Sequence, residues 1–125
     1  KNELIKLLDK AYAPYSNFHV SAIVEMKDGK FIPGVNVENA SYGGTICAER
    51  TAAVKAVSEG ETEFLAVAIA CSGPSPAYPC GICRQVMSEF AQADFRIFVV
   101  KNESDYREYR LEELLPHSFG TEQLQ

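Results

Sequence analysis

The two stretches of sequence that decide the fold are Cys47-Ala48-Glu49-Arg50 and Pro79-Cys80-Gly81-Ile82-Cys83-Arg84-Gln85. The second stretch contains two cysteines separated by two residues, a spacing that often binds zinc through thiolates. The first adds one more cysteine, and the carboxylate of Glu49 follows two residues later. Three thiolates leave one position of a tetrahedral zinc ion for water, and a neighbouring carboxylate can move that water's protons. Together the two stretches predict a zinc hydrolase.

Both stretches fall where a loop gives way to a predicted helix. Unpaired N–H groups and the helix dipole at such an end lower the pKa of a thiol and stabilise a thiolate. Cys47, Cys80 and Cys83 could therefore bind one metal ion between two helix ends. Arg50 is a candidate donor to a ligand sulfur, where it would offset the negative charge of the thiolates.

Other interpretations of these residues are open from the pattern alone. The cysteine pair is also typical of a structural zinc knuckle, closed by Cys47 or Cys71 into a four-cysteine site, or of a redox pair. Cys71 ends an apolar run, where a free cysteine usually behaves as a small hydrophobic residue. Glu49 could be an ordinary acidic residue of a first helical turn.

Hydrophobic periodicity outside the two stretches predicts alternating helices and strands. Asp28-Gly29 indicates a β-hairpin, and Pro33-Gly34 indicates an edge strand or a bulge. The strand–helix–strand order from Phe64 to Val100 indicates a pair of parallel strands. The expected elements are a helix from Asn2 to Tyr12, strands 18–26 and 30–38, a helix 47–59, a strand 64–71, a helix 80–91, strands 95–100 and 106–110, and a helical turn 111–115.

Composition limits the class of protein. The chain has 125 residues, 46% of them hydrophobic, which suits one α/β domain over residues 1–125. A net charge of −5 without a basic cluster argues against a nucleic-acid partner. The longest apolar run, from Phe64 to Cys71, is too short to span a membrane. The polar start at Lys1-Asn2-Glu3 suggests a helix rather than a secretory signal, and the cysteine usage favours a reducing cytoplasm.

The ordered motifs resemble those of the small homotetrameric cytidine deaminases, one branch of the zinc nucleoside and nucleobase deaminases. The resemblance covers nearly the whole chain. Its blocks are Ala13-Pro14-Tyr15-Ser16-Asn17-Phe18, Asn36-Val37-Glu38-Asn39-Ala40-Ser41-Tyr42-Gly43, Cys47-Ala48-Glu49-Arg50-Thr51-Ala52, the Pro79–Gln85 stretch, and Glu113-Leu114-Leu115-Pro116.

The resemblance implies a three-layer α-β-α fold, in which helices cover both faces of a mixed five-stranded sheet. It implies one Zn²⁺ per subunit, held by Cys47, Cys80 and Cys83, with Glu49 as the catalytic proton shuttle. Water activated at the metal would attack C4 of the cytosine ring, and Glu49 would protonate N3. Ammonia would then leave, converting cytidine and 2'-deoxycytidine into uridine and 2'-deoxyuridine for pyrimidine salvage.

Substrate-binding positions follow from the same resemblance. Asn36 and Glu38 lie two apart on a predicted strand, hence on one face, and the family uses these positions for the ribose hydroxyls. Without the resemblance, Asn36 and Glu38 would be interpreted as ordinary polar residues at the end of a strand. The family places Phe18 beside the pyrimidine, although its spacing equally suits core packing. Backbone atoms around Ala48 are expected to contact the cytosine edge.

The resemblance also implies a homotetramer whose active sites are shared between subunits. Phe119 would stack over the base of a neighbouring subunit, unless it simply anchors the tail, and Ala40 and Tyr42 would contact the substrate across another interface. Ser21 stands where the family usually has glycine, and the segment from Gly43 to Ile46 varies and borders the site. Alternatives to a nucleoside deaminase are deamination of another small cytosine compound, polynucleotide editing, and a non-catalytic zinc-binding module.

Overall fold

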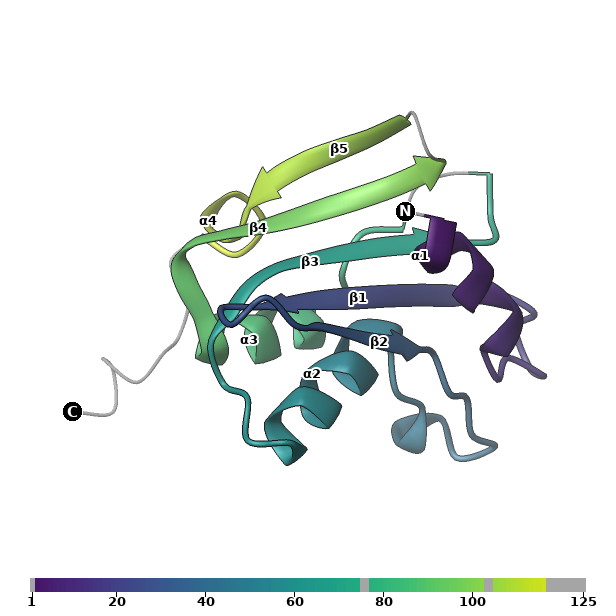
Figure 1. Cartoon of the computed structure of the whole chain (residues 1–125). Coiled ribbons are helices and arrows are strands. Elements are labelled where there is room, and N and C mark those ends of the chain that lie inside the picture. Colours follow the sequence, from purple (N-terminus) through teal and green to yellow (C-terminus); the bar gives the residue numbers. More distant parts are fainter. Residues whose placement is uncertain (1, 75–76, 103–104, 117–125) are drawn as a thin grey trace.

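The computed structural model describes residues 2–74, 77–102 and 105–116. These residues form a mixed five-stranded sheet in the order β2-β1-β3-β4-β5 (Figure 1). Strands β3 and β4 are parallel, and β1 and β2 are antiparallel, as the sequence predicts. The β1–β3 and β4–β5 pairs are also antiparallel. The elements are α1 (Asn2–Lys6), η1 (Leu7–Lys10), β1 (Val20–Met26), β2 (Phe31–Val35), η2 (Tyr42–Gly44), α2 (Ala48–Ser58), β3 (Phe64–Cys71), α3 (Gly81–Phe90), β4 (Ala91–Asn102), β5 (Asp105–Arg110) and α4 (Leu111–Leu114), where η denotes a 3₁₀ helix.

Helices cover the two faces of the sheet unequally. Successive side chains of a strand point to opposite faces, so Val67 and Ile69 of β3 lie on the face that α2 and α3 cover, in the main hydrophobic core. Ala70 lies on the other face, where Leu4 of α1 packs against it. Figure 1 shows α2 and α3 together on one side of the strands, while the short α1 lies near one end of the sheet. The predicted α/β class with helices on both faces is confirmed.

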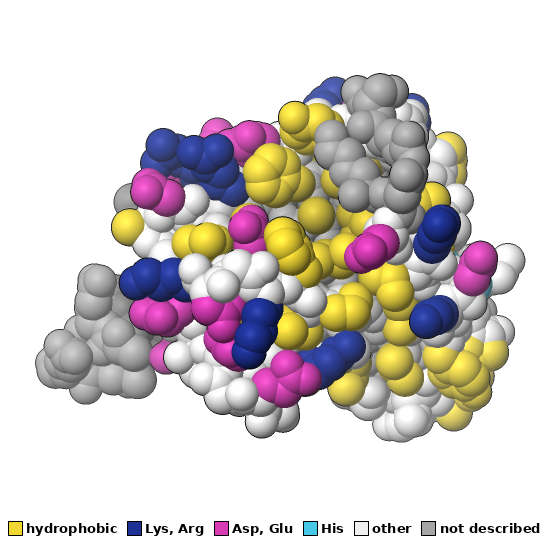
Figure 2. All heavy atoms as spheres, in the orientation of Figure 1, with side chains coloured by type: hydrophobic (Ala, Val, Ile, Leu, Met, Phe, Trp, Pro, Cys, Tyr) yellow, Lys and Arg dark blue, Asp and Glu magenta, His cyan; other side chains and the backbone are white. Residues whose placement is uncertain are grey.

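Among the described residues, α1 is the only α-helix on its face of the sheet, and it covers only part of that face. An apolar groove of about 670 Å³ lies beside α1, and Ile23, Ala68 and Phe98 are among the residues that line it. Figure 2 shows hydrophobic side chains gathered among charged ones over the strands in this view. No helix in the described ranges is long and apolar enough to cross a bilayer.

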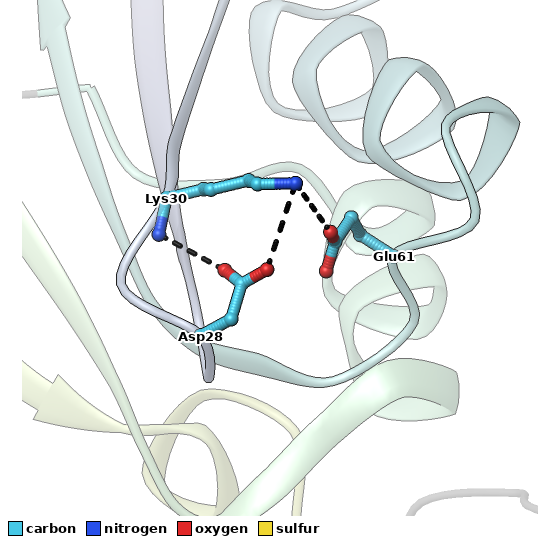
Figure 3. A network of polar contacts seen from close by, with 3 residues as sticks. All are labelled: Asp28, Lys30 and Glu61. Carbon is cyan, nitrogen blue, oxygen red and sulfur yellow. Dashed lines mark hydrogen bonds and ion pairs between the residues drawn. The ribbon is translucent and has the colours of Figure 1, made fainter.

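The predicted β-hairpin between β1 and β2 is present, and it carries a charged network at its tip. Gly29 has a φ of +93°, a conformation that favours glycine. Lys30 Nζ lies 3.0 Å from Glu61 Oε1 and 3.7 Å from Asp28 Oδ2, which links the turn to the segment after α2 (Figure 3). Because the side chains of Asp28 and Lys30 are exposed and that of Glu61 is only half-buried, water screens the network and it contributes little to stability.

The start of the chain differs from the prediction of one helix reaching Tyr12. Helix α1 ends at Lys6 and η1 follows it. Tyr12 instead donates its backbone N–H to the Asn36 carbonyl, which places it beside β2 rather than on a helix. Strand β1 begins at Val20, not at Phe18, because the backbone N–H groups of Phe18 and His19 donate to the side chains of Ser16 and Ser72 rather than to a neighbouring strand. Tertiary pairing here overrides local helical periodicity.

Three other predicted boundaries also shift. Strand β2 ends at Val35 instead of Glu38, and Val37 then makes only isolated bridges. Helix α2 begins at Ala48, with Cys47 as its N-cap, and ends at Ser58. Strand β4 is longer than predicted, running from Ala91 to Asn102, because its ends pair with β3 and β5 although they are half-buried or exposed. Exposed strand residues have no hydrophobic signal for a sequence pattern to detect.

Small residues allow α2 to lie directly on the sheet. Ala52 and Ala53 of α2 are fully buried. A Cβ atom at Gly34 of β2 would lie 2.5 Å from the Ala52 backbone nitrogen and 2.6 Å from the Ala48 carbonyl oxygen. These contacts show that the alanines of α2 face the sheet. They also bring the first turn of α2, with Ala48, against the edge strand β2.

Candidate functional site

Three cysteine sulfur atoms meet at the N-termini of α2 and α3. Cys47 is the N-cap of α2, Cys80 is the N-cap of α3, and Cys83 lies in the first turn of α3. The Cys80 sulfur lies 3.5 Å from that of Cys47 and 3.3 Å from that of Cys83. Zinc–sulfur bonds of about 2.3 Å in a tetrahedral site place ligand sulfurs about 3.8 Å apart, so this cluster fits zinc closely.

The fourth cysteine lies outside this cluster. Among the described residues, the side chains that could together hold a metal ion are Cys47, Cys80 and Cys83, whose sulfurs lie within 4.8 Å of one another. Cys71 ends β3 and does not belong to the group. The alternative of a closed four-cysteine site that uses Cys71 is therefore wrong. A three-thiolate site leaves a tetrahedral metal one position for water or substrate.

The electrostatics of the cluster favour a thiolate at Cys47. Hydrogen bonds from Cys83 and Cys80, together with the nearby Arg50, lower the pKa of Cys47 to about 5. The pKa of Cys83 is raised instead, because its thiol shares the hydrogen bond with Cys47 and because it is buried. Cys80 also caps α3, since its sulfur accepts the Cys83 backbone N–H at 3.4 Å. Thiolates are the form in which cysteine binds metals.

Glu49 is a buried carboxylate at the start of α2. Its exposed fraction is 3%, and burial raises its pKa to about 7. A carboxyl group with a pKa near neutrality can both accept and donate a proton, which is what general acid–base catalysis needs.

Arg50 follows Glu49 in the sequence and reaches the loop before α2. The Arg50 Nη2 atom donates a hydrogen bond to the Thr45 carbonyl at 3.2 Å and lies 4.0 Å from the Cys47 sulfur. The position of Arg50 fits the predicted donor to a ligand sulfur.

A cavity of about 210 Å³ opens onto the cysteines and Glu49. It is smaller than the range of about 300–1,000 Å³ typical of drug-sized ligands, so it suits one small ring. Its described lining residues are Phe18, Val20, Asn36, Thr45, Ile46, Cys47, Ala48, Glu49, Ile69, Ala77, Tyr78 and Cys80. The structure thus brings predicted residues from four separate parts of the chain into one cavity.

The two predicted sugar-binding residues are both occupied by contacts within the chain. The Asn36 side chain accepts the Val20 N–H at 2.9 Å and donates to the Phe18 carbonyl at 2.9 Å. Glu38 accepts the backbone N–H groups of Tyr15 and Ser16 and the Ser16 hydroxyl, and the hydroxyl bond is the largest cause of its lowered pKa. Asn36 lines the cavity beside the cysteines and Glu49, whereas Glu38 lines a neighbouring cavity of about 200 Å³.

The predicted inter-subunit residues lie at the surface or beyond the described part. Tyr42 is 82% exposed and lines the same neighbouring cavity as Glu38. Ala40 is exposed in the loop before η2. Phe119 lies outside the described residues. Tyr42 and Ala40 therefore both lie at the surface of the chain.

Sequence reasoning missed several residues of the site. Ala77 and Tyr78 line the cavity although no motif singled them out, because their loop has neither periodicity nor ligand chemistry. Ile46 also lines the cavity, and it belongs to the segment that was expected to border the site. Arg84 stood within a quoted motif, yet its role depends on a distant partner, the Leu114 carbonyl, at 2.8 Å. Arg84 and Leu114 are thirty residues apart, so no local sequence pattern predicts this contact.

Comparison with known proteins agrees with the site. Residues 2–99 match the family described as the cytidine and deoxycytidylate deaminase zinc-binding region. The chain is 47% identical to a cytidine deaminase of Halalkalibacterium halodurans over 98% of this chain and 92% of that protein. A cytidine deaminase of Sporosarcina psychrophila is 41% identical over 95% and 88% of the two chains.

Solved structures show the same fold. The crystal structure of a cytidine deaminase from Burkholderia pseudomallei superimposes with a TM-score of 0.87 at 42% identity, over 94% of both chains. That of a cytidine deaminase from Mycobacterium tuberculosis gives 0.81 at 38% identity, over 95% of this chain and 93% of the other. With its three-cysteine cluster beside a buried glutamate, the chain belongs to the zinc-dependent cytidine and deoxycytidylate deaminase family.

Proposed function

We propose that this protein deaminates free cytidine and 2'-deoxycytidine by hydrolysis, giving uridine and 2'-deoxyuridine with release of ammonia for pyrimidine salvage. The observation that carries the proposal is the buried carboxylate of Glu49, which lines the same cavity as Cys47 and Cys80. Relatives named cytidine deaminase, 47% and 41% identical over nearly the whole chain, support this substrate.

The residues of the cavity have separable roles in this reaction. Cys47, Cys80 and Cys83 would hold one Zn²⁺ per subunit, which when bound supplies a positive charge that acidifies water and polarises the reacting centre. Glu49 takes a proton from the attacking water and delivers it to N3 of the pyrimidine. It then takes the remaining proton of the new C4 hydroxyl group and delivers it to the departing amino group. The C4–N bond breaks, a C4–O bond forms, and the products are uracil nucleoside and ammonia.

Other residues would orient the substrate. Phe18 and Ala48 both line the cavity. Phe18 would lie beside the base, and backbone atoms of Ala48 would contact the cytosine edge. Asn36 and Glu38 are assigned to the ribose side, where the cavities that they line adjoin at Thr45. Arg50 would offset the negative charge of three thiolates through its contact with Cys47.

The finer assembly and location are part of the same proposal. Residues 1–125 form one domain that assembles as a homotetramer in the cytoplasm. Phe119 of one subunit would stack over the base in another, and Ala40 and Tyr42 would reach a neighbouring site. Support comes from the Tyr42 side chain, which is 82% exposed and lines the cavity beside Glu38.

The test is the variant Glu49→Gln, compared with Glu89→Gln on the exposed side of α3. Glutamine keeps the shape of the side chain but cannot accept and return a proton, so turnover should fall by at least about a hundredfold. Zinc content should stay near one per chain in both variants, because Glu49 is not one of the sulfur ligands. Loss of absorbance on incubation with cytidine gives the rate, and metal analysis of the same sample gives the zinc.

The outcomes separate the remaining alternatives. Comparable turnover in Glu49→Gln would contradict the role of the carboxylate. Wild-type protein that contains zinc but leaves cytidine unchanged would contradict the proposed substrate and would favour another cytosine compound or a non-catalytic zinc module. A single-stranded DNA substrate serves as the third comparison, and preference for it would favour a polynucleotide editor.

A further inference from the structure

The loop that leads into Cys80 has few backbone contacts of its own. Outside helices and strands, none of the backbone–backbone hydrogen bonds between described residues involves Ala77, Tyr78 or Pro79. Pro79 also lacks an N–H to donate. Yet Ala77, Tyr78 and Cys80 line the catalytic cavity, so something else must hold this loop in place.

Arg84 supplies one such contact from the first turn of α3. Its Nε donates to the Pro79 carbonyl at 2.7 Å, and its Nη1 donates to the Leu114 carbonyl at 2.8 Å. Hydrogen bonds from a charged donor are short and strong, and the planar guanidinium holds two acceptors in a defined geometry. Leu114 is the last residue of α4, where helix carbonyls have no partner within the helix.

A second contact joins the same loop to the same end of the chain. The hydroxyls of Tyr78 and Tyr109 lie 3.0 Å apart, and their rings meet edge to face with centroids 5.6 Å apart. Tyr109 belongs to β5, which leads directly into α4. Tyr109 and Leu114 both pack against the main core, so the β5–α4 unit is itself firmly seated.

We propose that Arg84 is a positioning residue of the metal site, which clamps the Pro79 carbonyl to the β5–α4 unit and thereby sets the position of the Cys80 sulfur. Metal sites tolerate errors of only about 0.2 Å in ligand distance. Loss of the clamp frees the residue that precedes Cys80, so the Cys80 sulfur and the cavity wall at Tyr78 both lose their fixed position. The part of the inference that concerns cytidine kinetics rests on the proposed function, whereas the part that concerns zinc release does not.

The experiment measures zinc release from the loaded wild-type enzyme and from Arg84→Met, using an excess of a chromogenic chelator and no substrate. Methionine keeps an apolar stem and removes all donors. Release should be at least about tenfold faster in Arg84→Met, the lower end of the effect of residues that support metal ligands. The matched control is Arg96→Met, which removes an exposed arginine that pairs with Glu108 at 3.2 Å. Its release rate should equal that of wild type.

Two further readouts separate positioning from general stability. Arg84→Lys retains one charged donor and should release zinc at an intermediate rate. With cytidine as substrate, Arg84→Met should raise KM more than it lowers kcat in zinc-saturated enzyme, because Tyr78 and Ala77 wall the cavity. A purely structural role would lower the unfolding temperature while leaving zinc release and KM at the wild-type values, and that result would overturn the inference.

Tyr109→Phe keeps the test decisive if Arg84→Met does not fold. It removes the hydroxyl contacts of Tyr109 with Tyr78 and with Arg107, and it should speed zinc release by a smaller factor in the same direction. Release at the wild-type rate would overturn the coupling of β5–α4 to the metal site. The measurement of zinc release needs no substrate. If the wild-type enzyme were inactive on cytidine, the proposed function would be contradicted, but zinc release would still test the role of Arg84.

Discussion

At the scale of single residues, the structure separates two side chains that look equivalent in sequence. Asn36 and Glu38 were both predicted to bind ribose hydroxyls from one face of a strand. Asn36 is buried, and its amide joins the backbone of Phe18 to that of Val20. Glu38 lies beyond the end of β2 and holds the exposed turn at Tyr15 and Ser16. Their substitutions should therefore have different consequences.

Asn36→Ala should lower both stability and substrate affinity. It leaves the Val20 N–H and the Phe18 carbonyl without their partner, and unsatisfied buried groups cost about 1–3 kcal/mol each. Glu38→Ala should raise KM for cytidine with little change in unfolding, because water can replace the carboxylate at an exposed turn. Urea unfolding and steady-state kinetics of both variants provide the measurement. An unchanged KM in Glu38→Ala would contradict a role of Glu38 in substrate binding and would favour a purely structural role.

At the scale of elements, the site depends on how closely α2 approaches β2. Both Cys47 and Glu49 lie at the start of α2, and the helix is pressed against the strand at Gly34. Pro33-Gly34 predicted an edge strand, which is correct, since β2 ends the sheet. Only the packed structure shows that Gly34 is required for the contact between backbones.

Gly34→Ala should destabilise the protein and disturb the site. Its Cβ would overlap backbone atoms of Ala48 and Ala52, which cannot rotate away as a side chain can. We expect a loss of about 1–3 kcal/mol in the free energy of unfolding, as for other overpacked positions. Gly43→Ala is the control, because nothing lies within 4 Å of a Cβ there. Equal stability of the two variants would show that α2 can shift away from β2 at no cost.

At the scale of the whole molecule, the metal site joins two helices that are distant in sequence. Cys47 begins α2, while Cys80 and Cys83 begin α3, and β3 lies between the two helices in the chain. A metal bound by all three thiolates would cross-link the layer of helices on this face of the sheet. Zinc should therefore stabilise the fold as well as enable the reaction.

Removal of zinc with a chelator should abolish cytidine turnover and lower the unfolding temperature, and added zinc should restore both. Ligand linkage predicts about 4 kcal/mol of stabilisation at free zinc a thousandfold above Kd. Thermal unfolding at several zinc concentrations measures this dependence. Cys71→Ser should still bind one zinc per chain, since Cys71 lies outside the cluster, whereas Cys83→Ser should lose tight binding. Loss of zinc from Cys71→Ser would restore the four-cysteine alternative.

The α/β class, the parallel β3–β4 pair, the hairpin at Asp28-Gly29 and the cluster of three cysteines could all be predicted from the sequence. Each has a local signal: hydrophobic period, turn chemistry or the spacing of cysteines around a helix start. Tertiary structure alone decided that helix α1 stops at Lys6, that Asn36 bonds to the Phe18 backbone, and that Arg84 reaches Leu114. These features depend on contacts between segments far apart in the chain, and such contacts exist only once the sheet and helices have packed.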